Sequence, residues 1–517
     1  MLEILTRALP PQRLCLLLLT LFVSTELLHG QSVRPAESRA SLHLESVRKR
    51  PLLALAFLRE MPKGGDLHNH LGGAIYAENL IAFAAQDKLC VDRKTLAIVS
   101  AACDNSCDKE SALATQCATS DQDLYNSIVD AWSVRNWERG HESGHDHFFS
   151  TFSKFEHVLD NHTGEFIAVA MNQAAADHVQ YLELMHTIGG SSAAVLGAKL
   201  SFDGNFSAER QKLIANGFEE NITQIRHQLD RDEQTARKTL ACGSDRPDPG
   251  CQVDIRYLYQ VLRAFPPEQV FAQILTGFEL ASVDPRVVGL NLVMPEDSEI
   301  SMRDFDLHMK MIDYLHRVYP KVHIALHAGE LAMGLVPPDG LRFHIRESIE
   351  VGHAERIGHG VDVMNERDPF GLLHEMADRK VLVEICLTSN DVILSIKGKE
   401  HPFPIYRQFK VPVTLATDDE GVSRTDMTHE YLRALVTYNL SYHDLKQMAR
   451  ESLEHSFLPG ASLWADLHTN RTVAECAITR STTADVPVKC ARFLDANEKA
   501  QMQWKLEAEF KTFERKF

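Results

Sequence analysis

The sequence has no surplus of positive charge, since 54 lysines and arginines face 71 aspartates and glutamates and give a net charge of -17. Such a surface repels the phosphates of a nucleic acid and the headgroups of an anionic membrane. Aromatic residues are also few, at 8%, although 44% of the 517 residues are hydrophobic, as in an ordinary large globular protein. We therefore expect a small-molecule substrate and no nucleic-acid partner.

Beyond residue 30 the chain has no run of roughly 18 apolar residues, the length that a membrane-spanning helix needs. The N-terminus combines Arg7 and Arg13 with an apolar run over 14–23 and a polar exit, a pattern typical of a cleaved secretory signal peptide over 1–30. We expect a secreted or periplasmic protein without a membrane span. A retained signal anchor is the alternative.

No internal repeat is visible, and short apolar runs alternate with longer amphipathic segments, a pattern typical of βα units around a parallel sheet. Helices are expected between the strands, for example over 267–281 and 302–318. Eight such strands predict an α/β protein of the (β/α)8 TIM-barrel type. The predicted strands are 65–70, 179–185, 253–262, 287–293, 322–327, 356–359, 381–387 and 413–417.

These strands belong to one predicted (β/α)8 domain, 51–494, which opens with an apolar helix over 51–60. A polar leader over 31–50, expected to be mobile, precedes it, and a long insertion at about 75–178 follows the first strand. Residues 495–517 mix charge with large apolar residues and predict an amphipathic helix that closes the barrel. That helix could instead contact a partner subunit, and no pattern defines the oligomeric state.

Ten cysteines, most of them in polar, loop-like segments, favour export to an oxidising compartment. Cys242 and Cys251 bracket one short polar loop, and Cys476 and Cys490 bracket another. We expect a disulfide within each pair.

The insertion contains four further cysteines, and disulfides among them would cross-link the insertion internally. Their spacing leaves the pairing of Cys90, Cys103, Cys107 and Cys117 open. A zinc site on Cys103 and Cys107 is disfavoured, because a second ligand pair at suitable spacing is missing. Cys386 lies in an apolar run and is expected to be a buried free thiol.

Polar side chains stand at the carboxyl ends of four predicted strands. In the first strand two histidines share a face, because strand side chains alternate. In a barrel this rim is where active sites assemble, so residues distant in sequence are expected to converge there. The residues concerned are His68 and His70, His327 with Glu330, His359, and Asp418 with Asp419.

Three imidazoles and one carboxylate suit a single zinc ion with a position left for water. Zinc lowers the pKa of bound water to around 7, which supplies a nucleophile at neutral pH. Glu330 is then positioned for proton transfer. Alternatively, His68 and His70 are a hydrogen-bonded pair on the surface. Glu330 could instead be a carboxylate that only supports the metal ligands, and His359 could itself be a metal ligand. The predicted ligands are His68, His70, His327 and Asp418.

The motifs at these strand ends resemble those of the adenosine deaminase family, as do the segments 181–184, 383–386 and 456–459, so that the similarity covers roughly 60–460. The resemblance implies zinc ligation by the four residues just given and protonation of purine N1 by Glu330 while water attacks C6. It also implies that His359 orients or deprotonates the water and that Asp419 hydrogen-bonds N7. The implied reaction converts adenosine to inosine and ammonia, and 2′-deoxyadenosine to 2′-deoxyinosine and ammonia.

The substrate pocket is less closely matched. Phe148 and Phe152, one helical turn apart, resemble the aromatic helix over the family's nucleoside pocket, although such a pair is often core packing. Gly72 replaces an acidic or hydroxyl residue that reaches the ribose 5′-hydroxyl, and Met294 replaces a glycine whose backbone approaches N3. These departures leave open another purine or a 5′-modified nucleoside as the substrate.

Four other classes of protein share single features with this sequence or its family. The segment 141–145 fits the metalloprotease pattern H-E-x-x-H, but Gly140 and Gly144 disfavour the helix that it needs. The Pro-Cys-x-x-Cys element of cytidine deaminases is missing, and no lysine on the strand over 287–293 can bridge two metals. A secreted growth-factor-like binding protein stays open, although the intact site residues favour an enzyme.

Overall fold

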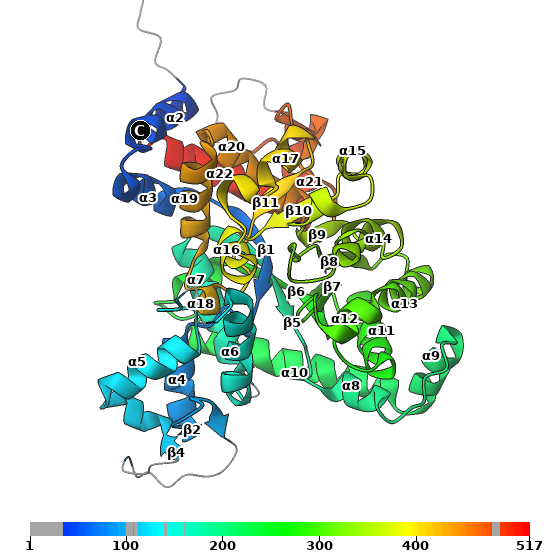
Figure 1. The fold of residues 1–517 in the computed structure, drawn as a ribbon. Helices are drawn as coiled ribbons and strands as arrows, with labels where there is room; N and C mark the ends of the chain where they lie inside the picture. The colour runs from blue at the N-terminus through cyan, green and yellow to red at the C-terminus, as the bar shows by residue number, and fades with distance from the viewer. Residues whose placement is uncertain (1–34, 100–106, 108–111, 139–141, 160, 478–485) are drawn as a thin grey trace, which may run out of the picture.

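The structure is a computed structural model that describes residues 35–99, 107, 112–138, 142–159, 161–477 and 486–517. The predicted signal peptide, 1–30, lies outside the described residues. Eight parallel strands form one sheet in the order β1-β5-β6-β7-β8-β9-β10-β11, which confirms the predicted fold class (Figure 1). The strands are β1 (Gly64–His70), β5 (Val179–His186), β6 (Asp254–Leu262), β7 (Val287–Val293), β8 (His323–Ala328), β9 (Arg356–His359), β10 (Leu382–Ile385) and β11 (Val413–Leu415).

Main-chain hydrogen bonds between β1 and Asp418, three residues beyond the end of β11, close the sheet into a barrel. The N–H of Asp418 donates to the carbonyl of His68 at 2.8 Å, and the N–H of His70 donates to the carbonyl of Asp418 at 3.2 Å. Apolar side chains from all eight strands fill the core. The closure therefore places three predicted site residues at a single seam.

Helices cover the barrel between successive strands, as the alternating pattern predicts. Proline occupies the first turn of α11 (Pro267–Val283) and α15 (Pro369–Arg379), where its missing N–H costs no hydrogen bond. A capping box at Ser441 starts α20 (Tyr442–Glu454). The other outer helices include α10 (Phe218–Thr239), α14 (His344–Glu350), α16 (Leu387–Leu394), α17 (Phe403–Gln408) and α19 (Met427–Tyr438).

The insertion between β1 and β5 contains a small antiparallel sheet, β2 (Cys90–Asp92), β3 (Ile98–Val99) and β4 (Ala112–Ala114), which projects from one side of the barrel (Figure 1). A disulfide joins Cys107 to Cys117, and Cys90 is also disulfide-bonded. Cys103 lies outside the described residues. The insertion helices are α4 (Ala77–Gln86), α5 (Gln122–Ala131), α6 (Gly144–Leu159) and α7 (Thr163–Ala176).

The other cysteine predictions are confirmed. Disulfides join Cys242 to Cys251 and Cys476 to Cys490. Cys386 is a buried free thiol. The Cys476–Cys490 disulfide anchors α21 (Val488–Asp495), the helix that precedes the C-terminal helix α22 (Glu498–Glu514).

Four predicted segments need correction. The strand expected over 381–387 ends at Ile385, because Cys386 caps α16 and the apolar run continues into that helix only as far as Leu387. The strand expected over 413–417 ends at Leu415. The helix expected over 302–318 is two helices, α12 (Glu299–Arg303) and α13 (Phe305–Val318). Part of the polar leader is the helix α2 (Ala36–Val47), because the apolar residues among its charged ones fall on a buried face.

The H-E-x-x-H segment does not form a peptidase site. The helix α6 begins at Gly144, so Glu142 precedes it, and His141 lies outside the described residues. The ring nitrogens of His145 lie 2.9 Å from Asp297 and 3.0 Å from Asp146. The histidine is therefore held by two carboxylates of its own surroundings.

Candidate metal centre and active site

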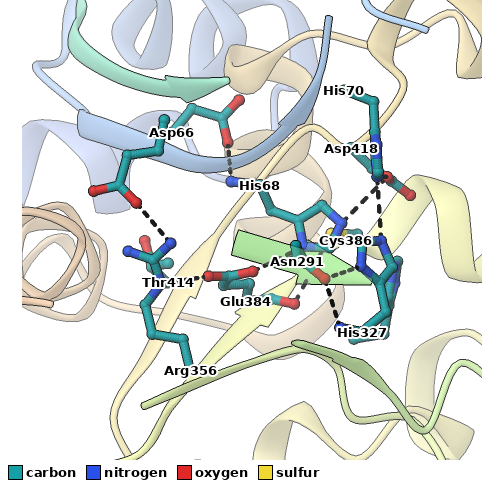
Figure 2. Close-up of polar contacts among 12 residues, drawn as sticks. Asp66, His68, His70, Asn291, His327, Arg356, Glu384, Cys386, Thr414 and Asp418 are labelled. Atoms are coloured by element: carbon teal, nitrogen blue, oxygen red, sulfur yellow. Dashed lines mark hydrogen bonds and ion pairs between the residues drawn. The ribbon is translucent and has the colours of Figure 1, made fainter. Parts of the chain in front are cut away.

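The predicted metal ligands converge at the carboxyl ends of the barrel strands (Figure 2). One ligand atom from each of His68, His327, His359 and Asp418 lies within 4.8 Å of the others. His70 forms a second such group with Asp418 and Asp419. The barrel thus gathers residues that the sequence separates by 350 positions.

Distances between the converging atoms fit the edges of a zinc tetrahedron. Ligand atoms about 2.0–2.1 Å from a tetrahedral zinc ion lie roughly 3.3 Å from one another. Nε2 of His70 lies 3.1 Å from Nε2 of His327 and 3.3 Å from Oδ1 of Asp418, and Nε2 of His68 lies 3.4 Å from that oxygen. Nε2 of His68 is buried without a hydrogen-bond partner among the described residues. The donor set therefore fits one zinc ion.

Each of these three histidines places its other ring nitrogen against an oxygen acceptor. Nδ1 of His68 lies 2.8 Å from Glu384, Nδ1 of His70 lies 2.9 Å from the Gln260 side-chain oxygen, and Nδ1 of His327 lies 2.8 Å from that of Asn291. Nδ1 therefore carries the proton, and Nε2 keeps a lone pair for a metal.

A buried chain of charges extends from His68 through the barrel interior (Figure 2). The guanidinium of Arg356 lies 2.8 Å from Glu384 and 2.7 Å from Glu183, and it stacks on the ring of Phe457 with its carbon 3.9 Å from the centroid. All three charged side chains are fully buried. Both carboxylates therefore have a cationic partner, and Glu384 accepts a hydrogen bond from Nδ1 of His68.

Glycine at position 358 makes room for His68. A Cβ at Gly358 would lie 2.6 Å from Cε1 of the His68 ring. Two non-glycine site residues, His359 and Asp418, adopt left-handed backbone conformations with φ of 69° and 61°. Such conformations cost energy and cluster at functional sites, where the surrounding structure enforces them.

Glu330 lies directly beyond β8, with its backbone held by a second carboxylate. The N–H groups of Gly329 and Glu330 donate to Glu296 at 3.0 and 2.8 Å. Oε1 of Glu330 is buried without a hydrogen-bond partner among the described residues. Burial and the charge of Asp418 raise its pKa well above the ordinary value, which keeps the carboxyl protonated.

Asp419 and His359 are both buried beside Asp418. Burial, followed by the charge of Asp418, raises the pKa of Asp419 well above its ordinary value. Burial lowers the pKa of His359 to about 3, so its imidazole is neutral. Both side chains can therefore take part in hydrogen bonds without carrying a charge.

The three predicted pocket residues lie in apolar surroundings. Phe148 is fully buried in the core, whereas Phe152 is half-buried, with the two ring centroids 5.6 Å apart. Met294 packs against apolar side chains of the barrel interior and has a φ of 83°. This left-handed conformation explains why a glycine suits position 294.

The residues that support the site were not assigned from the sequence. Glu384 and Asn291 each stand within an otherwise apolar strand, and Gln260 stands in the apolar carboxyl half of β6. Their partners come from other strands. A lone polar residue inside a buried strand is a signal that could have identified them. It does not reveal which histidine each one contacts.

Imidazoles and a carboxylate gather at the strand ends of a parallel α/β barrel. This combination of fold and site is typical of the metal-dependent barrel hydrolases. The chain belongs to the adenosine deaminase family, since the family model "Adenosine deaminase" matches residues 111–464, more than half of its length. The match begins after β1, so His68 and His70 lie outside it.

Individual relatives agree with this placement. An adenosine deaminase of Clostridium perfringens is 33% identical over 135 residues, which cover 26% of this chain and 37% of the relative's length. The N6-mAMP deaminase of Arabidopsis has a TM-score of 0.52 at 20% identity, covering 78% of this chain and 96% of that one.

Two further structures share the fold. Arabidopsis ADAL in complex with IMP has a TM-score of 0.54 at 18% identity and covers 88% and 99% of the two chains. An amidohydrolase of Burkholderia ambifaria with bound Zn has a TM-score of 0.50 at 15% identity and covers 88% and 95%. At these identities the likeness concerns the fold alone.

Proposed function

We propose that this protein is a zinc-dependent aminohydrolase that converts adenosine and 2′-deoxyadenosine to inosine and 2′-deoxyinosine with release of ammonia. One observation carries the proposal. Three lone-pair nitrogens and a carboxylate converge beside the buried, protonated carboxyl of Glu330, and three of the distances between them are 3.1, 3.3 and 3.4 Å.

His68, His70, His327 and Asp418 are the proposed ligands of one zinc ion. When bound, zinc supplies an activated water nucleophile at neutral pH. The chain's own contribution is to orient these ligands through Glu384, Gln260 and Asn291.

Glu330 is the proposed general acid. Its protonated carboxyl donates to N1 of the purine, which makes C6 electrophilic, as general acid catalysis requires. Water supplies the oxygen of the new C6–O bond, the C6–N bond breaks, and the exocyclic nitrogen leaves as ammonia. Adenosine and water are thereby converted to inosine and ammonia.

His359 and Asp419 would contact the reactants. His359 orients or deprotonates the water, and Asp419 hydrogen-bonds N7. Phe148, Phe152 and Met294 would bound the purine pocket, with Phe152 the more accessible of the two aromatic rings.

A purine nucleoside 5′-monophosphate or another 5′-modified nucleoside is the second candidate substrate. Gly72 offers no side chain to a ribose 5′-hydroxyl, and two structures of the same fold are an N6-mAMP deaminase and an IMP complex. We also propose that the protein is exported, because its disulfides are typical of oxidising compartments. Among the described residues no helix is long and apolar enough to cross a membrane.

A substrate panel tests the proposal. Purified full-length protein is incubated with adenosine, deoxyadenosine, adenine, AMP and N6-methyl-AMP, with and without a chelator, and deamination is followed by ultraviolet absorbance. We expect turnover of adenosine that the chelator abolishes. Turnover of only the nucleotides would move the assignment to the second candidate. No turnover of any of them would favour a binding protein.

A further inference from the structure

His359 differs from the three proposed histidine ligands in the atom that its Nδ1 faces. That nitrogen lies 3.0 Å from the side-chain nitrogen Nδ2 of Asn390. An amide nitrogen donates hydrogen and cannot accept it, so Nδ1 of His359 is the acceptor. A neutral imidazole with an accepting Nδ1 carries its proton on Nε2.

The orientation of the Asn390 amide is fixed from its other side. Its oxygen lies 3.1 Å from Nε2 of His401, and Nδ1 of His401 accepts the backbone N–H of Phe403 at 3.1 Å. A backbone N–H is always a donor, so His401 carries its proton on Nε2 and donates it to the Asn390 oxygen. The amide nitrogen is thereby left to face His359.

Burial protects this chain of hydrogen bonds from exchange with water. His359, Asn390 and His401 are all buried. Oε1 of Glu330 lies 3.6 Å from Nδ1 of His359, which is beyond hydrogen-bond distance. Nε2 of His359 is buried without a partner among the described residues, in a ring whose centroid lies 4.8 Å from that of His68.

We infer that the backbone N–H of Phe403, acting through the positioning residues His401 and Asn390, fixes His359 as the Nε2–H tautomer, so that His359 offers the site a proton donor and is not a metal ligand. What this tautomer means for catalysis rests on the proposed function. Of the two roles open to His359, it selects orientation of the water by an N–H donor over deprotonation.

Nitrogen magnetic resonance tests the tautomer directly. The protein is prepared with 15N in its histidine rings, and a His359→Gln sample identifies the signals of His359 by their loss. We expect Nε2 of His359 to carry the proton and Nδ1 to be unprotonated, both before and after addition of zinc. A proton on Nδ1 in the wild type overturns the inference.

Cadmium-113 in place of zinc tests ligation in the same samples. We expect scalar coupling of the metal to one nitrogen in each of three histidine rings and none to His359. Coupling to His359 contradicts the inference. Neither measurement uses turnover, so both outcomes stand apart from whether adenosine is the substrate.

Asn390→Asp reverses the direction of the hydrogen bond to Nδ1 of His359, because a carboxylate oxygen accepts a hydrogen bond whereas the amide nitrogen donates one. We expect the His359 proton to move to Nδ1, and kcat on the substrate found by the panel to fall about 100-fold while KM changes less than about threefold. His401→Gln is the matched control, since its amide can still donate to the Asn390 oxygen, and it should keep the wild-type tautomer. An unchanged tautomer in Asn390→Asp contradicts the inference, and where that variant does not fold, the wild-type spectrum decides.

Discussion

His70 and Asp418 contact each other twice, through the main-chain hydrogen bond that closes the barrel at 3.2 Å and through side-chain atoms 3.3 Å apart at the proposed metal position. Barrel closure and metal binding therefore depend on the same pair of residues.

Removal of the metal is expected to destabilise the fold as well as to abolish turnover, because a ligand that binds only the folded state stabilises it in proportion to its affinity. Calorimetry should show a lower Tm after dialysis against a chelator and recovery with added zinc. An unchanged Tm in protein shown by elemental analysis to lack metal would contradict this coupling.

Glu330→Gln should keep one zinc ion per chain and the wild-type Tm, but lose about 10²–10⁴-fold in kcat, because the amide cannot protonate N1. Elemental analysis and steady-state kinetics of the same preparation check both parts. Full activity would exclude the proposed role of Glu330.

Gly73→Ala should displace Asp419. A Cβ at Gly73 would lie 1.6 Å from Oδ1 of Asp419, whereas one at the neighbouring Gly72 meets only Leu159 at an ordinary 3.5 Å. We expect kcat/KM to fall at least about tenfold in Gly73→Ala, with metal retained, and to stay near wild type in Gly72→Ala. Equal values for the two variants would argue against a substrate contact by Asp419.

Arg356→Met leaves the buried carboxylates of Glu183 and Glu384 without their cation. Breaking a buried ion pair in this way costs about 3–5 kcal/mol, and loss of support behind a ligand weakens metal binding about 10–100-fold. Urea unfolding and competition with a chelator measure the two effects. Lys310→Met, which breaks an exposed pair with Asp306, is the control and should cost less than about 1 kcal/mol.

Glu451 gives the stability a specific pH dependence. Burial raises its pKa from 4.5 to about 7. Between these values the folded protein keeps a proton that the unfolded chain has released, so its free energy of unfolding falls as pH rises, by about 1.4 kcal/mol per pH unit. Above pH 7 the fall ends, at a total of roughly 3 kcal/mol.

Glu451→Gln isolates this effect, since the amide oxygen can still accept the hydrogen bond from Gln447. Urea unfolding at several pH values measures the effect. Between pH 4.5 and 7 the free energy of unfolding of the variant should rise relative to that of the wild type. Parallel curves for the two proteins would show that Glu451 is ionised in the folded state.

Most of the strands could be predicted because they contain short apolar runs, and the proposed ligands because each stands at or near the carboxyl end of a predicted strand. Boundaries failed where the pattern continues across a change of structure, as at Cys386, which is as apolar as the strand before it. The partners of the ligands could not be predicted: Glu384 contacts His68 from 316 positions away, and only the barrel's curvature determines that pairing.

The C-terminal helix α22 packs beside α2, and its residue Met502 accepts a hydrogen bond from Gln180 at the amino end of β5 (Figure 1). Phe517 packs against Phe57 of α3 (Pro51–Glu60), which leads into the amino end of β1, so the C-terminus lies on the side of the barrel away from the proposed site. A surface tether or fusion partner joined at this end would leave the mouth open to solution, which suits the protein to immobilisation on a solid support.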